Sequence, residues 1–261
     1  MSLIYKDSNN KVLLKDGLVG LDTNLVINDW WEYKTQLDLS LNTKYWESYD
    51  YSGGITSAPI DTNPYGNQDL LWETKGTKDT SRPAMRNFSM VNGKYNWYID
   101  NTKDYRITCF FNMKQISGGT IEPSAYFGML VYNDGVSSLL QYISNGVFPS
   151  THYSYYATTP RSIFNEDQWY LSVGYIHNIN YPSGSTADPD FYGYIYDMDG
   201  NVIAQRNIEV KFYNLSNNIK ITNTMPYNGY DKYQQYMPRL EIMDGTEPTI
   251  SDILSGNNIK K

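Results

Sequence analysis

The sequence predicts an all-β protein, and three observations lead to this fold class. Apolar and polar residues alternate with a period of two through much of the chain, which is the pattern of half-buried strands. Turn-forming pairs such as Asn-Gly and Asp-Gly separate these runs at short intervals. No long apolar stripe at helical spacing is present. Many short strands with such punctuation favour two packed antiparallel sheets or a barrel.

The clearest strand is expected over residues 104–115. Its odd-numbered positions Tyr105, Ile107, Cys109, Phe111 and Met113 fall on one face of an extended chain. The opposite face is mostly polar and is interrupted by Phe110. We therefore expect one face of this strand to lie against the core.

Two further tyrosine-rich or tryptophan-rich strands are expected after it. Residues 168–178 carry apolar side chains on both faces, which is typical of a central strand covered on both sides. Residues 190–198 place Tyr192, Tyr194 and Tyr196 in a row on one face. The other expected strands cover residues 125–133, 138–143, 201–212, 219–222 and 235–243.

The pattern of apolar and polar residues divides the chain into two parts. Residues 1–21 resemble a small hairpin with a polar turn at residues 7–10, and an isolated hairpin needs a partner to be stable. Residues 22–261 are expected to form the main β domain. Within that domain, residues 47–69 are rich in Ser, Gly, Pro, Asn and Asp and are expected to form a long loop.

The amino-acid composition limits the kinds of partner and cofactor that we expect. The formal net charge of −7 and the pI of about 4.8 would repel a phosphate backbone, so nucleic acid is not an expected partner. Cys109 is the only cysteine, so no internal disulfide and no thiolate metal cluster are expected. No apolar run is long enough for membrane insertion, and no export signal is recognised at the start. We expect a soluble protein without a cofactor or metal.

The sequence contains few residues of the types that form the usual catalytic sites. His152 and His177 are the only histidines, and His177 is best interpreted as a hydrogen-bonded histidine at a strand end. Most acids lie at turns, where turn geometry explains them. Asp197, Asp199 and Asn201 imitate the start of a calcium loop, but Ile208 stands where the bidentate Glu would be, so a hairpin turn is the better interpretation. No catalytic residue and no metal site are predicted, although one calcium ion between loops is left open.

Aromatic residues in expected loops give the positive signal. Sugars present C–H faces that stack on Trp and Tyr rings, while their hydroxyls bind Asn, Asp and Gln. Trp97 and Trp169 lie in or beside strands and are expected in the core. The candidate glycan contacts are Trp30, Trp31, Trp72, Tyr153, Tyr155 and Tyr156.

Several segments together resemble a module found near the ends of tail fibres and related adhesion proteins of tailed bacteriophages. They are WYLSVGYIH (169–177), YGYIYDMDGNVI (192–203) and QQYMPRLEIMDGTEPTISDIL (234–254), preceded by NLVINDWW, YRITCFFNMK and AYFGM in the same order. The resemblance covers about residues 24–254, and its last 20 residues or so are the most specific part. The segment NTMPYNGYDKYQQY departs from the family pattern because it is polar and rich in tyrosine.

The N-terminal hairpin at residues 1–21 precedes the segments that carry the resemblance, and it is expected to be an appendage for assembly. The resemblance implies a jelly-roll β-sandwich, similar to carbohydrate-binding modules. It also implies a non-enzymatic structural protein of the virion, working outside the cell. Its expected partners are a host-surface glycan and other virion proteins, and the subunit is expected to be a homotrimer. In the terminal segment Arg239, Asp244 and Glu247 are expected to be structural, with Arg239 paired to an acid such as Glu241 or Asp244, and Pro238 at a sheet edge or bulge.

Two other functions stay open at this point. A polysaccharide depolymerase would need a pair of acids, or a His and Tyr site, in a cleft. A virion decoration or spike-base protein would have no ligand at all.

Overall fold

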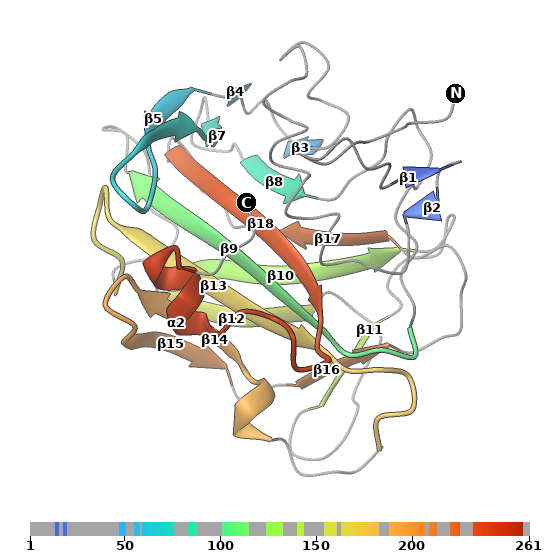
Figure 1. The fold of residues 1–261 in the computed structure, drawn as a ribbon. Coiled ribbons are helices and arrows are strands. Elements are labelled where there is room, and N and C mark those ends of the chain that lie inside the picture. Colours follow the sequence, from blue (N-terminus) through green and yellow to red (C-terminus); the bar gives the residue numbers. More distant parts are fainter. Residues whose placement is uncertain are drawn as a thin grey trace.

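The structure is a computed structural model, and it describes fifteen segments of the chain. They are residues 14–15, 18–19, 47–50, 55–57, 59–75, 83–87, 101–114, 124–132, 140–143, 154–160, 163–182, 188–206, 209–212, 220–224 and 232–257. Most of these residues lie in strands of antiparallel sheets, with few helical turns (Figure 1). The all-β prediction is confirmed.

The larger sheet has seven strands and is built around β9. Its order is β15 (Val202–Arg206), β14 (Gly193–Asp197), β13 (Trp169–Ile176), β9 (Tyr105–Lys114), β18 (Lys232–Ile242), β7 (Trp72–Lys75) and β4 (Ile55–Ser57). In Figure 1, β13, β9 and β18 run side by side through the middle of the molecule. Phe110 of β9 pairs with Leu171 on one side and Tyr236 on the other, so residues far apart in sequence meet at the sheet centre.

A second sheet has five strands. Its order is β12 (Ser154–Pro160), β10 (Ser124–Tyr132), β17 (Lys220–Thr224), β8 (Pro83–Asn87) and β3 (Glu47–Asp50). Strands β10 and β12 contact β13, β14 and β15 of the larger sheet. Three two-stranded sheets complete the described strands: β1 (Leu14–Lys15) with β2 (Leu18–Val19), β5 (Ile60–Thr62) with β6 (Gln68–Leu70), and β11 (Leu140–Ile143) with β16 (Glu209–Phe212).

The long strands lie where the sequence places them, but two other predictions differ and one is not tested. Residues 201–212 were expected to be one strand and instead form β15 and β16, which belong to different sheets. Residues 47–69 were expected to be loop, yet they contain β3, β4, β5 and most of β6. Strands β3 and β4 pair with β8 and β7, and β5 pairs with β6 in a local hairpin, so pairing overrides their weak propensity. In the N-terminal segment only β1 and β2 are described, so the hairpin expected around residues 7–10 lies outside the described residues.

Strand β9 is buried on both faces, which corrects the expectation of a polar face. On the expected apolar face, Phe111 stacks on Tyr170 with ring centroids 5.6 Å apart. On the opposite face, Phe110 is fully buried in a second cluster with Trp169 and Leu171. Residues of helix α2 (Ile250–Ser255) join this cluster, so the helix supplies the apolar cover that β9 needs on that side (Figure 1).

A bulge interrupts β18 in the middle of its pairing with β9. The register shifts between Tyr236 and Arg239, and Met237 adopts a left-handed φ of 47°. Pro238 has no N–H to give to the ladder, so the bulge is where a central strand accommodates it. The bulge expected from the sequence is confirmed.

Candidate functional site

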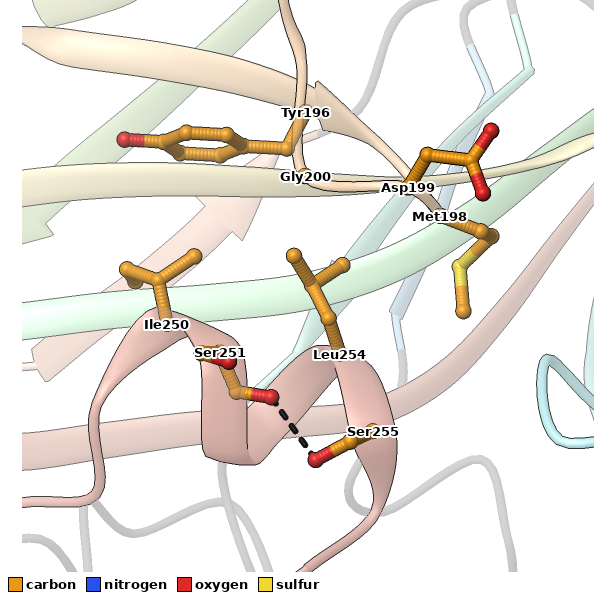
Figure 2. A pocket seen from close by; sticks show the side chains of 8 residues that line it. All are labelled: Tyr196, Met198, Asp199, Gly200, Ile250, Ser251, Leu254 and Ser255. Atoms are coloured by element: carbon orange, nitrogen blue, oxygen red, sulfur yellow. Dashed lines mark hydrogen bonds between the residues drawn. The ribbon is translucent and has the colours of Figure 1, made fainter.

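An open groove lies between helix α2 and the hairpin of β14 and β15. It encloses about 460 Å³, a volume within the range of small-molecule sites. It is lined by Tyr196, Met198, Asp199, Gly200, Ile250, Ser251, Leu254 and Ser255. Figure 2 shows Ile250 and Leu254 rising from the helix toward the hairpin, with Tyr196 above Ile250 and with Met198 and Asp199 nearer Leu254.

The hairpin wall is fixed by the carboxylate of Asp197. Its Oδ1 accepts hydrogen bonds from the backbone N–H groups of Asp199 (3.0 Å) and Asn201 (2.8 Å), and its Oδ2 accepts one from Asn201 Nδ2 (2.9 Å). Although burial opposes it, these hydrogen bonds hold the pKa of Asp197 below its usual value. Gly200 completes the turn with a φ of 87°, a conformation that glycine adopts without strain. The sequence YDMDGN is therefore a hairpin turn, as predicted.

No metal site is found among the residues that the structure describes. Both carboxylate oxygens of Asp197 accept hydrogen bonds from N–H groups. The positive ends of these N–H dipoles occupy the positions where a cation would bind the carboxylate. No group of three or more His, Cys, Asp or Glu side chains in the described part of the chain is arranged to hold a metal ion. A calcium site built from a cluster of such side chains is therefore not present in these segments.

The helix wall is short but capped at both ends. At its start, the Thr249 hydroxyl accepts a hydrogen bond from the N–H of Asp252 (3.1 Å), while the Asp252 carboxylate accepts one from the N–H of Thr249 (3.1 Å). At its end, Gly256 takes the left-handed conformation, and the Tyr65 hydroxyl donates to the carbonyl of Ile253 (2.7 Å). Ile253 and Leu254 are buried against the sheet. These contacts hold a helix of six residues in place.

A buried charge cluster beneath the helix anchors the segment that leads into it. Glu241 accepts hydrogen bonds from two arginines: Arg106 Nη2 lies 2.6 Å from Oε2, and Arg239 Nη2 lies 2.6 Å from Oε1. Arg106 also donates to the carbonyl of Pro248 (2.5 Å), at the entry to α2. Two guanidinium groups share one carboxylate, so Arg106, Glu241 and Arg239 form a buried triad with one positive charge in excess.

The terminal residues singled out in the sequence lie around this triad. Arg239 pairs with Glu241, one of the two acids expected, whereas Arg106 was missed as the second partner because it comes from β9, far away in sequence. Asp244 accepts hydrogen bonds from the N–H and hydroxyl of Thr246 (3.0 and 2.7 Å). Glu247 accepts from the N–H groups at the start of the same turn.

The groove offers two kinds of contact to a ligand. Tyr196, Met198, Ile250 and Leu254 provide an apolar, partly aromatic surface. The polar side chains are those of Asp199, Ser251 and Ser255, and the Ser255 hydroxyl donates to the carbonyl of Ser251 (2.8 Å; dashed in Figure 2). Burial raises the pKa of Tyr196 further above neutral pH, and its neutral phenol can both donate and accept hydrogen bonds to a ligand. This combination suits a sugar ring, which has apolar C–H faces and hydroxyl edges.

The groove holds one carboxylic acid, Asp199. Glycosidases of the two-carboxylate type place a pair of acids across the scissile bond. A single exposed acid at the groove rim can accept hydrogen bonds from sugar hydroxyls, but it has no second acid among the lining residues to divide the roles of acid and base. The described lining of this groove therefore lacks the acid pair that the two-carboxylate mechanism uses.

His177 is a buried residue at the end of β13, as the sequence predicted. Its backbone N–H donates to the carbonyl of Val210 (2.7 Å), and its ring stacks on Tyr181 with centroids 3.7 Å apart. Its Nδ1 lies 3.6 Å from Oδ1 of Asp104. Although burial opposes it, the nearby imidazole of His177 and the hydrogen bonds from the backbone N–H and side-chain amide of Asn178 hold the pKa of Asp104 below its usual value. His152 lies outside the described residues.

Of the aromatic residues proposed from the sequence, the three that the structure describes (Trp72, Tyr155 and Tyr156) are not among those that line this groove. Trp30, Trp31 and Tyr153 lie outside the described residues, as does Trp97. Trp72 lies in β7, and the segment expected to be an aromatic loop forms β12, with Tyr155 and Tyr156 in the strand. Trp169 is buried, as expected, and donates from Nε1 to the carbonyl of Thr62 (3.2 Å).

The groove residues could be recognised in the sequence only in part. The row of tyrosines on one face was noted for residues 190–198, and the structure places Tyr194 and Tyr196 in β14. The terminal segment was expected to be amphipathic, but nothing in the sequence indicates that it packs beside this particular hairpin. That neighbourhood arises from the sheet order.

Comparisons with protein-family models and with curated proteins found no match to this chain. Within the described segments, no helix has the length and apolar character needed to cross a membrane.

Proposed function

We propose that this chain is a structural protein of a tailed-bacteriophage virion, a tail-fibre or spike subunit that adheres to host-surface glycans without catalysing their cleavage. In this proposal the two large sheets form a jelly-roll sandwich similar to a carbohydrate-binding module. The contacts of β10 and β12 with β13, β14 and β15 support two sheets that pack on each other. The resemblance of residues 24–254 to the ends of tail fibres supports the place in the virion.

The groove beside α2 is the observation that carries the binding role. It sets the half-buried ring of Tyr196 next to two serines and an exposed carboxylate, in a volume suited to a small polar ligand. Proteins bind sugars with this pairing of an aromatic face and directional polar groups. One such site would bind weakly, and display on a trimer would raise the avidity without new contacts.

Binding to a printed glycan array tests the adhesive role. The purified full chain is expected to bind a subset of glycans, and Tyr196→Ala is expected to lose that binding because the stacking surface is removed. Val202→Ala is the matched control: Val202 is an exposed apolar residue (49 % exposed) of the same hairpin, but it does not line the groove. Equal loss in both variants would indicate non-specific apolar adhesion and contradict the proposal.

Two further measurements separate the alternatives. Release of reducing ends from a bound polysaccharide would identify a depolymerase in place of an adhesin. Silence across the array, together with tight binding to a capsid or baseplate preparation, would identify a ligand-free virion component.

The oligomeric state tests the fibre assignment. Light scattering after size exclusion is expected to give a trimer, and deletion of residues 1–21 is expected to give a folded monomer. A trimer that survives this deletion would contradict the assembly role of the N-terminal segment, and a wild-type monomer would contradict the fibre assignment.

A further inference from the structure

The aromatic surface of the groove continues along β14 beyond the groove itself. Tyr194 lies two residues before Tyr196 on the same face of the strand, and their ring centroids are 5.8 Å apart with the rings tilted by 38°. Both side chains are half-buried, so each keeps part of its surface accessible to solvent. Tyr194 is not among the lining residues, so its contact with Tyr196 extends the aromatic surface along β14 beyond the groove.

The surroundings of this tyrosine pair are acidic. Asp199 lies at one end of the groove and is exposed, and none of the lining residues is Lys or Arg. Asp190 lies in the short helix η3 (Pro189–Phe191), and Asp188 comes just before it, in the segment that leads into β14 on the Tyr194 side of the pair. Burial first, and then the proximity of Tyr196, Asp190 and other neighbours, raise the pKa of Tyr194. Carboxylates at both ends would repel an anionic ligand.

The rigidity of the two rings suits an extended ligand. Val173 and Leu171 of the neighbouring strand pair with Tyr194 and Tyr196, and both are fully buried in the core beneath them. The two rings are therefore carried by a paired strand at the sheet surface and not by a loop, so their separation is set before any ligand binds. Prearranged contacts lower the entropic cost of binding.

We propose that Tyr196 and Tyr194 form two adjacent subsites for an uncharged linear oligosaccharide, with one sugar residue in the groove on Tyr196 and the next on Tyr194. This inference rests on the proposed glycan-binding function and names the class of ligand: neutral, and at least a disaccharide. Asp199, Ser251 and Ser255 would accept or donate hydrogen bonds to the hydroxyls of the sugar in the groove.

Calorimetric titration with ladders of mono- to tetrasaccharides tests this assignment. The probes are ladders of N-acetylglucosamine, galactose and mannose, with galacturonic-acid and sialic-acid ladders as anionic counterparts. For a bound neutral ladder, the disaccharide is expected to bind about tenfold more tightly than the monosaccharide, which is about 1.4 kcal/mol. The longer members are expected to add little, and the anionic ladders are expected to bind least.

Single substitutions assign the two subsites. Tyr194→Ala is expected to reduce disaccharide affinity to the monosaccharide level while leaving monosaccharide affinity unchanged, and Tyr194→Phe is expected to retain the gain. Tyr196→Ala is expected to abolish binding of both. Thermal unfolding midpoints measured for Tyr194→Ala and Tyr196→Ala, and expected to show a cooperative transition as in the wild type, separate these effects from misfolding.

The outcomes distinguish this inference from the proposed function. Binding that is lost in Tyr196→Ala, but indifferent to ligand length and to Tyr194→Ala, overturns the two subsites and leaves the adhesive function standing. Preference for an anionic ladder overturns the inference about charge. Absence of binding to every ladder overturns the proposed function, and the subsites with it.

Discussion

Neutralising Glu241 is expected to destabilise the protein more than removing either arginine that binds it. In the wild-type triad, the carboxylate faces two guanidinium groups, and the three side chains of Arg106, Glu241 and Arg239 are 5 %, 2 % and 4 % exposed. Glu241→Gln keeps the shape but leaves two buried positive charges facing an amide. Arg239→Met instead removes the charge in excess and leaves Arg106 paired with Glu241.

The expected magnitudes follow from these contacts. Glu241 accepts four hydrogen bonds from the two arginines, at 3.1, 2.6, 3.0 and 2.6 Å. Leaving a buried charge without its counter-ion costs about 3–5 kcal/mol, which for a chain of this size is a fall of roughly 10 °C in melting temperature. Arg239→Met loses two of the hydrogen bonds but also loses a buried charge, so its cost is expected to be on the order of 1–2 kcal/mol.

Urea denaturation followed by circular dichroism measures both free energies of unfolding. Glu166→Gln is the matched control, because it makes the same chemical change at an exposed position and is expected to stay within about 0.5 kcal/mol of wild type. Two results would contradict this expectation. One is a Glu241→Gln variant that is no less stable than the control, and the other is an Arg239→Met variant that loses more unfolding free energy than Glu241→Gln. Either result would mean that the triad does not carry a net buried charge.

Three smaller predictions concern Asp104, the C-terminal cap of helix α2 and the turn between β14 and β15. Asp104 has a lowered pKa in the folded state. Its contribution to stability is therefore complete above its unfolded pKa of about 3.8 and is lost as the pH falls through the folded value. Asp104→Asn should flatten the acid side of the profile of unfolding free energy against pH, measured by urea denaturation, and an unchanged slope would contradict this. Gly256→Ala should cost about 1–2 kcal/mol, because φ is 71° and the new Cβ would lie 3.2 Å from Tyr65 Cε1; a neutral result in chemical denaturation would refute the cap geometry. Asp197→Ala should increase amide hydrogen exchange at the β14–β15 turn, whereas Asp197→Asn, which keeps an acceptor, should do so less.

The strands themselves were readable from the sequence where the alternation was long. Residues 105–114 and 169–176 show it over many positions, and these became the central strands β9 and β13. Short segments such as 47–50 and 55–57 were missed, since their strand conformation depends on pairing with β8 and β7. The segment containing Tyr155 was misread as loop for the same reason, because it is held by β10.

The sequence by itself determined the all-β class, the long strands and the turn at Asp199-Gly200, because each depends on backbone preferences that act over a few residues. It left Pro238 at either a sheet edge or a bulge, and the pairing of β18 with β9 decided for the bulge. Only the tertiary structure decided that the second face of β9 is buried, that Arg106 and Arg239 share Glu241, and that α2 lies beside β14. These features join residues more than a hundred positions apart or elements that are not neighbours in the chain. The local sequence pattern does not indicate which surfaces pack against each other, because that packing depends on the apolar area and the charges that the whole chain buries together.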